Sequence, residues 1–476
     1  MSIDHAPLHD WALPGPMNGG DAWMWRVSRD PRLPMNVVAI YVLASAPDWE
    51  RVRRCFKWCL ERVPRLRQRV LEFATETGPA TWSPDPEFRL DDHLRRIRLP
   101  GPGDRRQLLH AVEWWAGQDL DRTRAPWEAI LVEGYKGDKA ALILKWHHCF
   151  ADGIGIVQML RRLLPSTPEA RQDEERPFEF EAMARAHHPS LTGLNQHLQA
   201  MATAIAQETG RAAQYFFGKA QTLMQDPTPA ACRPPDIAWP AGQYKLLPGS
   251  ALLRRRGLGR RFETVEVPGS ALRRAAERTG TSTAAVFVAA VLGACQKYHR
   301  HFNATAENLS TAMPVNLRDF GHRGPGNHIG VMLLRGAFGD IDPAARVRAV
   351  HELIKRERND LVEEVIPLVS AMACWIPGIA LRMSAYDMLS KIDLWVSSVP
   401  GYSRPCYIAG AEFVEDMTFA PRAGSACNAT MVSHGDTSCV ALNIDPAAFT
   451  DPSRFHQLVQ EEFTAIFEPE PDGSWG

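Results

Sequence analysis

The sequence predicts an α+β protein with two hydrophobic cores. Its 476 residues exceed what one small core can organise, so two domains or two large subdomains are expected. Segments with strand and helix patterns follow one another in a similar order in residues 1–165 and in residues 260–476. Residues 166–259 include proline-rich and charged pieces, which indicates a connector that crosses between the two subdomains rather than a third domain.

Composition and charge favour an ordinary globular protein and argue against a nucleic-acid-binding protein. Apolar residues make up 45% of the chain and charged residues 23%, which is the balance of an ordinary soluble globular protein. The formal net charge is −1, so the protein has no overall field that would attract nucleic acid. No nucleic-acid partner is expected.

Cysteine usage and the N-terminus indicate the compartment. The nine cysteines are an odd number without a Cys-x-x-Cys pair, which argues against a disulfide framework and against a zinc ribbon. A reducing cytoplasm fits this pattern best. The first residues contain no basic segment followed by an apolar core, so no signal peptide is expected.

The first subdomain is predicted to begin with a strand and a helix. Residues 34–44 are mostly aliphatic and have the character of a buried strand. Residues 48–63 place Val52, Phe56 and Leu60 on one side of a helix and basic residues elsewhere. Residues 64–70 are unusually basic, and their simplest interpretation is a solvated edge strand.

A hairpin is predicted next. Residues 129–135 and 139–146 should pair across a turn at Lys136-Gly137-Asp138. The second strand contains the aliphatic run at residues 140–144, and residues 156–164 have the apolar spacing of a helix. The stretch between this strand and this helix is where the chemistry is expected.

That stretch contains His147-His148-Cys149-Phe150-Ala151-Asp152-Gly153. A strand end holds a base rigidly, and a histidine titrates close enough to neutrality to take a proton from a hydroxyl. We expect His148 to be that base, with His147 beside it in the site. Asp152 would hold the loop or one imidazole by hydrogen bonding or ion pairing. Gly153 would allow a sharp turn or the close approach of a substrate.

Two histidines at the edge of a loop are more often ordinary polar residues, and the chain supplies a comparison. His187-His188 repeats the pair in a polar connecting region without the aspartate, and we assign it no role. The histidine pair, the aspartate and the glycine together, at a strand-to-helix junction, favour a functional site.

Two rival chemistries are disfavoured. Adjacent residues on a strand point to opposite faces, so His148 could not easily activate Cys149 for an acyl-cysteine mechanism. Neighbouring histidines rarely present their nitrogens to one ion without a third nearby ligand. A metal bound by His147, His148 and Asp152 is therefore not expected.

Residues 147–153 resemble the HHxxxDG signature of the CoA-dependent acyltransferase superfamily. The flanking residues are similar to one branch, the bacterial wax ester synthase/diacylglycerol acyltransferases. The resemblance implies two chloramphenicol-acetyltransferase-like subdomains with His148 in an active-site tunnel between them. It implies transfer of a long-chain acyl group from acyl-CoA to the hydroxyl of a fatty alcohol or of diacylglycerol. It implies no cofactor, since acyl-CoA is a co-substrate.

Two segments of the first subdomain extend the resemblance. Leu66-Arg67 resembles a motif whose arginine holds the signature aspartate in condensation domains, so Arg67 would pair with Asp152. Trp127 lines up with the tryptophan of the family's Arg-Pro-Leu-Trp-Glu segment. The alignment implies a substrate contact for Trp127, although core packing is its simplest role.

Three residues of the second subdomain are also implied at the substrate. Asn316 lies in a segment similar to the family's Pro-Val-x-Leu-Arg, and Asn327 in one similar to Gly-Asn-x-x-Gly. Either asparagine could instead cap a turn. Ser398 stands where the family's Ser-Asn-Val-Pro-Gly-Pro has asparagine, and its hydroxyl could donate to a developing oxyanion.

The second subdomain is predicted to open with a strand at residues 262–267 and a helix at residues 271–279. Residues 284–295 are apolar all round and predict a buried helix. The family carries Asn-Asp at the start of that helix, whereas this chain has Thr283-Ala284. Later predicted elements are a strand at 394–400, a hairpin formed by 430–432 and 438–444, and a closing helix at 452–467.

Two stretches of the sequence could contact a lipid surface. Residues 365–381 carry no charge but contain Pro367 and Pro377, which favours a core or interfacial helix pair over a spanning helix. Residues 253–261 hold the most concentrated basic cluster, which is either a solvated loop or a site for CoA phosphates or anionic lipid headgroups. A peripheral position on the inner membrane face or on lipid droplets is thus one of the alternatives.

Two other functions also stay open. A condensation-type enzyme would take the acyl group from a carrier protein acting in trans, since this chain contains no carrier domain. A lipid-binding homologue with weakened catalysis is the other alternative, because Thr283-Ala284 and Ser398 depart from the family pattern.

Overall fold

The computed structural model describes residues 15–72, 76–78, 80–168, 249–305, 309–316, 327, 329–334, 341–359 and 376–468. Its strands are β1 (Gly15–Pro16), β2 (Asn36–Leu43), β3 (Gln68–Leu71), β4 (Thr81–Pro84), β5 (Leu94–Arg98), β6 (Trp127–Tyr135), β7 (Lys139–His147), β8 (Arg261–Pro268), β9 (Thr311–Asn316), β10 (Ile329–Leu334), β11 (Leu394–Tyr402), β12 (Cys406–Ile408), β13 (Ala411–Phe419), β14 (Cys427–His434) and β15 (Thr437–Ile444). Its helices are α1 (Gly19–Val27), α2 (Trp49–Arg62), η2 (Pro64–Arg67), α3 (Leu90–His93), α4 (Arg105–Ala116), η3 (His148–Phe150), α5 (Gly153–Leu163), α8 (Gly269–Thr279), α9 (Thr283–His301), α10 (Pro343–Asn359), α12 (Gly378–Leu389) and α13 (Pro452–Phe467).

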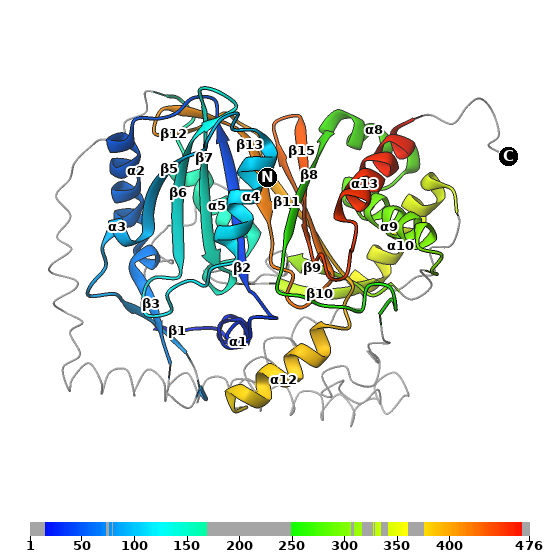
Figure 1. Cartoon of the computed structure of the whole chain (residues 1–476), viewed down its shortest axis with the longest axis horizontal. Coiled ribbons are helices and arrows are strands. Elements are labelled where there is room, and N and C mark those ends of the chain that lie inside the picture. The colour runs from blue at the N-terminus through cyan, green and yellow to red at the C-terminus, as the bar shows by residue number, and fades with distance from the viewer. Residues whose placement is uncertain are drawn as a thin grey trace, which may run out of the picture.

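Two six-stranded sheets stand side by side (Figure 1). The first has the strand order β12-β13-β2-β7-β6-β5, and the second has the order β10-β9-β11-β14-β15-β8. A small third sheet contains β1, β4 and β3. Helices α9, α10 and α13 lie on the outer side of the second sheet, and α2 lies on the outer side of the first (Figure 1). The predicted mixed α+β class with two cores is confirmed.

The two sheets share strands across the predicted subdomains. Strands β12 and β13 come from the second half of the chain, yet β13 pairs antiparallel with β2 and so belongs to the first sheet. Two strands that lie beyond the predicted boundary at residue 260 therefore belong to the first sheet. The halves are held together by a sheet ladder as well as by side-chain packing.

Strand β2 is buried on both faces, which explains its almost continuous run of aliphatic residues. Val37, Ala39 and Tyr41 pack with residues of α2 and α5 in one core cluster. Val38, Ile40 and Val42 pack on the opposite face with α4 and with residues of β8, β13 and β15. This second cluster fills the space between the sheets, where the rings of Phe262 and Phe419 stack with centroids 4.0 Å apart.

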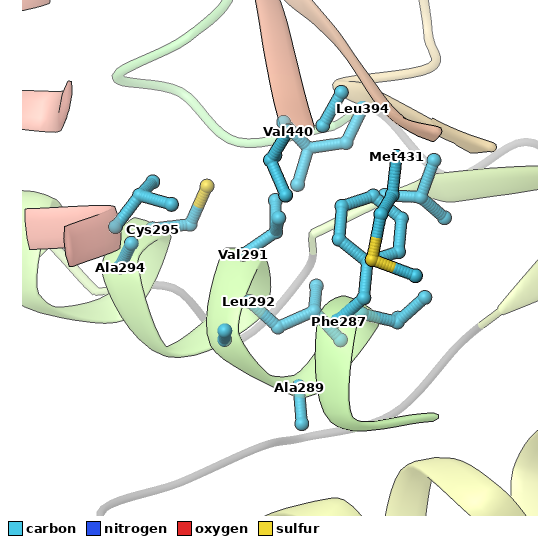
Figure 2. Close-up of a cluster of buried hydrophobic side chains, with 14 of the residues drawn as sticks. Phe287, Ala289, Val291, Leu292, Ala294, Cys295, Leu394, Met431 and Val440 are labelled. Atoms are coloured by element: carbon cyan, nitrogen blue, oxygen red, sulfur yellow. The ribbon is translucent and has the colours of Figure 1, made fainter. Parts of the chain in front are cut away.

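Helix α9 is the buried helix that the sequence predicts at residues 284–295. It runs from Thr283 to His301, and every residue from Ala285 to Cys295 is buried. Phe287 and Val291 lie among Leu394, Met431 and Val440 of the second sheet (Figure 2). The helix extends past the predicted end because its last turns pack polar and aromatic side chains, such as His299 and Tyr298, rather than an apolar run.

Several other predictions can be compared with the structure. The closing helix has the predicted bounds, and the β6–β7 and β14–β15 hairpins are present. The basic segment at residues 64–70 is not one strand, because η2 precedes the short strand β3. The predicted helix between Leu194 and Met224, the pair His187-His188 and most of residues 365–381 lie outside the described residues.

No single helix in the described ranges is long and apolar enough to cross a membrane. The bent pair of α8 and α9 passes such a test of length and composition together.

Candidate active site

The histidine pair lies where β7 ends and the chain turns through η3 into α5. His147 is the last residue of β7, and its backbone N–H donates to Pro126 O at 3.0 Å. The backbone N–H of His148 donates to Met35 O at 2.7 Å, just before β2 begins. Both backbones are therefore fixed by neighbouring strands, as predicted for a base at a strand end.

The side chain of His147 is buried and has two polar contacts. Its Nδ1 accepts a hydrogen bond from the backbone N–H of Cys149 at 3.1 Å, so the proton of the neutral ring lies on Nε2. That Nε2–H donates to Ser28 Oγ at 2.8 Å. Burial lowers the pKa of His147 well below its usual range, and the Arg122 charge lowers it further. His147 is thus a neutral residue that ties η3 to the end of α1.

The surroundings of His147 fix its ring. The ring meets Trp25 edge-on with centroids 5.0 Å apart, and the Arg122 guanidinium lies 3.7 Å from the Trp25 ring centroid on the indole face. Ser28 Oγ accepts a second hydrogen bond from Arg122 at 3.1 Å and donates its own proton to Trp25 O at 2.9 Å. These contacts hold the loop that carries His148, and the predicted catalytic role of His147 stays a prediction.

His148 is only half-buried, and its carbonyl oxygen accepts from Asn327 Nδ2 at 2.7 Å. Its Nδ1 is buried and has no hydrogen-bond partner in the described part of the chain. Burial lowers the pKa of His148, while the Asp152 charge, the backbone of His148 itself and the Asn327 side chain act in the opposite direction. A lowered pKa keeps the imidazole neutral at neutral pH, so it can accept a proton.

Asp152 is buried and caps the N-terminus of α5. Its Oδ1 accepts from the backbone N–H of Gly155 at 2.7 Å. This cap explains why α5 begins at Gly153, before the predicted start at residue 156. The negative charge of Asp152 also acts on His148 and on Asp21.

The predicted pair of Arg67 and Asp152 stays a prediction. Arg67 is the last residue of η2, and burial lowers its pKa to about 10, with Glu61 as the carboxylate that acts against this shift. Its neighbour Arg65 is the arginine whose charge acts on Asp21 and Cys149 near the motif. The Arg65 guanidinium lies 4.4 Å from the Trp82 ring centroid.

Gly153 lies against strand β11 of the second half of the chain. A Cβ at this position would lie 3.1 Å from Cγ2 of Val399, which is closer than ordinary van der Waals contact. The predicted close approach at Gly153 therefore occurs with a strand of the other half. Ser398 is the residue before Val399 in β11, and adjacent strand residues point to opposite faces, so this contact does not place its side chain; the predicted role of Ser398 stays a prediction.

Two other predicted residues differ in their placement. Asn316 ends β9 and pairs with Ile329 of β10, two residues from Asn327. Trp127 is buried in the core, where its ring stacks on His93 with centroids 4.8 Å apart. Its indole N–H donates to Leu66 O at 2.7 Å. The structure thus shows Trp127 in core packing, its simplest role, and its substrate contact stays a prediction.

Asn327 connects His148 to a residue that the sequence argument did not single out. Its Nδ2 donates to Asp21 Oδ1 at 2.6 Å as well as to the His148 carbonyl. Asp21 lies in the first turn of α1, capped by Asn18. An Asn-x-x-Asp spacing at a helix start is a local signal of a cap, but no local signal indicates a contact across 306 residues.

The thiol of Cys149 is buried, and burial raises its pKa well above the usual range. A neutral buried thiol is a poor nucleophile. Within the described residues, no group of three His, Cys, Asp or Glu side chains is arranged to hold a metal ion.

A cavity of about 540 Å³ lies beside the turn that follows α1. Four arginines and two aspartates line it together with smaller residues of both halves. The arginines are Arg32, Arg256, Arg382 and Arg422, and the aspartates are Asp30 and Asp445. Arg256 belongs to the basic cluster at residues 253–261. Arg32 lies three residues before Met35, whose carbonyl holds His148.

The geometry defines an enzyme-like site: a neutral, partly exposed imidazole on a rigid turn at the junction of two mixed sheets. Sequence comparison agrees. The wax ester synthase/diacylglycerol acyltransferase catalytic domain matches residues 17–287, and the C-terminal domain of the same family matches residues 325–467. The chain belongs to this family of acyltransferases.

Individual relatives support the assignment. A putative diacylglycerol O-acyltransferase of Mycobacterium tuberculosis is 29% identical over 458 residues, which cover 94% of this chain and 90% of the relative. A putative diacylglycerol O-acyltransferase of Mycobacterium bovis is 27% identical over 467 residues, covering 90% of this chain and 87% of the relative.

Solved structures share the fold. The wax ester synthase/diacylglycerol acyltransferase of Marinobacter aquaeolei superposes with a TM-score of 0.63 at 19% identity, covering 95% of this chain and 98% of that one. The first condensation domain of the calcium-dependent antibiotic synthetase gives a TM-score of 0.60 at 18% identity, with 96% of each chain covered.

Proposed function

We propose that this protein is an O-acyltransferase that moves a long-chain acyl group from acyl-CoA to the hydroxyl of diacylglycerol or of a fatty alcohol. The observation that carries the proposal is the His148 imidazole, which is half-buried and held on a turn whose backbone N–H and carbonyl are both hydrogen-bonded. Its lowered pKa favours the neutral form that a general base needs.

His148 is the general base in this proposal. Nε2 is the proposed acceptor, since Nδ1 is buried, and it takes the hydroxyl proton as the alcohol oxygen bonds to the thioester carbon. The carbon–sulfur bond then breaks, and the imidazolium returns its proton to the CoA thiolate, so that an ester and free CoA leave. Ser398 on β11 is the proposed donor to the transient oxyanion, because it stands where the family carries asparagine. The inert thiol of Cys149 supports direct transfer without an acyl-enzyme.

CoA is the proposed donor. The guanidinium groups of the cavity beside α1 could bind phosphate oxygens through charge-assisted hydrogen bonds, although each is also paired with a carboxylate: Arg32 with Asp30, Arg256 with Asp393, Arg382 with Glu76 and Arg422 with Asp445. A lipid acceptor fits a protein that works at a membrane or lipid-droplet surface on the cytoplasmic side. Helix α12 supports such peripheral contact, since its Ile379 and Met383 side chains are 71% and 66% exposed.

One assay tests the proposal. The full chain is incubated with radiolabelled palmitoyl-CoA and either hexadecanol or dioleoylglycerol, presented in phospholipid vesicles. We expect neutral lipid from the wild type. Replacing His148 by alanine removes the base and should lower kcat by about 10²–10⁴-fold with the fold intact. His110→Ala, an exposed histidine on α4, is the matched control and should keep wild-type activity.

Other outcomes would overturn the proposal. Full activity in His148→Ala would exclude His148 as the base. Product formed only from an acylated carrier protein would favour a condensation-type enzyme. Absence of product with every donor and acceptor would favour a lipid-binding homologue.

A further inference from the structure

Asp21 is a buried acid close to the histidine motif that the proposed chemistry does not use. Its side chain is 2% exposed. Its Oδ2 accepts from Asn18 Nδ2 at 2.7 Å, and its Oδ1 accepts from both the side chain and the backbone N–H of Asn327, at 2.6 and 3.3 Å. A single carboxylate thus holds the start of α1 and the residue that precedes β10.

Asn327 carries this contact to His148. One hydrogen of its Nδ2 points to Asp21 and the other to the His148 carbonyl, at 2.7 Å. Because both neighbours are acceptors, the amide group has only one orientation that satisfies them. Its Oδ1 is buried and has no hydrogen-bond partner in the described residues, as is true of His148 Nδ1. The Asp21 carboxylate therefore dictates which way the amide faces His148.

We propose that Asp21 is a positioning residue for His148 and acts through the side chain of Asn327. The proposal rests on the proposed role of His148 as general base. The backbone of His148 is held from two sides, at its N–H by Met35 and at its carbonyl by Asn327. The N–H and the carbonyl belong to the two peptide groups that flank the His148 Cα, at the start of the short helix η3, so holding both fixes the direction in which the Cα–Cβ bond carries the imidazole.

Stabilisation of helix α1 alone does not explain why a carboxylate is buried at position 21. The N-terminus of α1 is already capped, because Asn18 Oδ1 accepts from the backbone N–H of Asp21 at 2.8 Å. Burial raises the pKa of Asp21 to about 7, with the Asn327 hydrogen bonds and the Arg65 charge acting against the shift and the Asp152 charge acting with it. Burying this carboxylate opposes folding, so helix stability alone would favour a neutral residue.

The consequence for turnover is geometric. Without the carboxylate, the Asn327 amide can turn and release the His148 carbonyl, so the imidazole samples directions away from the reacting hydroxyl. Misplacement of a catalytic group by about 1 Å costs on the order of 10²-fold in rate. The loss should appear in kcat, since Asp21 itself touches neither the acyl donor nor the acceptor in this proposal.

A double-mutant cycle tests the pathway. Asp21→Ala, Asn327→Ala and the double variant are compared with the wild type for kcat, KM and thermal unfolding. We expect each single variant to lose about 10–100-fold in kcat with KM changed by less than about threefold. We expect the double variant to be no worse than the poorer single variant, because both changes break the same connection.

Two further variants sharpen the test. Asp21→Asn keeps an acceptor for Asn327 but presents an amide N–H₂ to Asn18, so it should retain more activity than Asp21→Ala. Asp104→Ala removes the N-cap of the distant helix α4 and controls for loss of a helix cap, with kcat expected at the wild-type level. Asp21→Ala with wild-type kcat, or losses that multiply in the double variant, would overturn the proposal.

A readout without turnover separates this proposal from the proposed function. Carbethoxylation of His148 by diethylpyrocarbonate, followed by mass spectrometry, reports how accessible and basic its free nitrogen is. We expect the His148 labelling rate to change by at least about threefold in Asp21→Ala, while exposed His110 is labelled at its wild-type rate. An unchanged His148 rate would contradict positioning by Asp21. An active His148→Ala enzyme would contradict the proposed function, whatever the labelling shows.

Discussion

At the residue scale, the two histidines of the motif differ in what surrounds them rather than in chemistry. His147 uses both ring nitrogens in hydrogen bonds to Cys149 and Ser28, whereas the Nδ1 of His148 has no such partner in the described structure. His147 is buried, while His148 is half-buried. A side chain with both nitrogens engaged holds a structure together, whereas the half-buried ring of His148 is the one proposed to react, and its buried Nδ1 leaves Nε2 as the proposed base.

This difference predicts separate effects of substitution. His147→Ala removes the acceptor of the buried Cys149 N–H and one of the hydrogen bonds of the Ser28 hydroxyl, so the free energy of unfolding should fall by about 1–3 kcal/mol. His147→Asn can still accept from Cys149 through its amide oxygen and should lose less. Urea denaturation of both variants measures the difference. Equal stability of His147→Ala and the wild type would show that these hydrogen bonds contribute nothing net.

Sequence reasoning reached part of the site for physical reasons. The motif is local, so its strand, turn and helix could be predicted from the pattern of residues 140–164. The contact of Asp21 with Asn327 spans 306 residues and depends on how α1 packs, which no local pattern encodes. For Trp127 the sequence suggested core packing and the family resemblance implied a substrate contact; the stacking on His93 shows the packing, which depends on a neighbour 34 residues earlier in the chain.

At the element scale, α5 is positioned by its contact with β11. Gly153 opens the helix and touches Val399, and Arg161 of α5 donates to Gly401 O of the same strand. The HHxxxDG glycine therefore sets the spacing between an element of the first half and a strand of the second. Because Gly153 has no side chain, α5 of the first half can pack closely against β11 of the second half.

A compensating pair of substitutions tests this spacing. Gly153→Ala adds a Cβ 3.1 Å from Val399 Cγ2, so β11 or α5 must shift, and we expect a loss of about 1–3 kcal/mol in the free energy of unfolding together with a lower kcat. Val399→Ala removes the methyl groups in the way. The double variant should recover at least half of the lost kcat. A double variant as slow as Gly153→Ala would place the cause elsewhere.

At the scale of the whole molecule, strand β13 joins the two halves, and a short segment pattern could not predict which sheet receives it. The predicted order of strands and helices was confirmed in outline, but sheet membership depends on pairing between distant segments. Asp416 lies in β13 opposite Tyr41 of β2 and is 3% exposed. Its carboxylate accepts from the Thr418 hydroxyl at 2.6 Å.

The pH dependence of stability should report this buried acid. Burial raises the pKa of Asp416 from 3.8 to about 7, and the Thr418 hydrogen bond opposes the shift. Since the folded state holds the proton more tightly than the unfolded state, the Asp416 contribution to the free energy of unfolding falls as pH rises between about 4 and about 7. Asp416→Asn does not titrate, so it should be more stable than the wild type by about 1–3 kcal/mol at about pH 8 and little changed at about pH 4.

Chemical denaturation at the two pH values measures the difference. Subtracting the wild-type curve removes the shared contribution of Asp21, whose pKa is shifted in the same direction. A variant that is no more stable than the wild type at the higher pH would mean that the Asp416 charge is compensated in the folded protein.

The pairing of β13 with β2 also limits where the chain could be cut into separate fragments. Strand β2 finds its outer neighbour only in a segment more than 360 residues later, at Ala411–Phe419. A fragment cut at the connector would leave β2 as an unpaired edge with aliphatic side chains on both faces. Such edges recruit strands from other molecules and aggregate. We therefore expect the two halves to fold together as one unit.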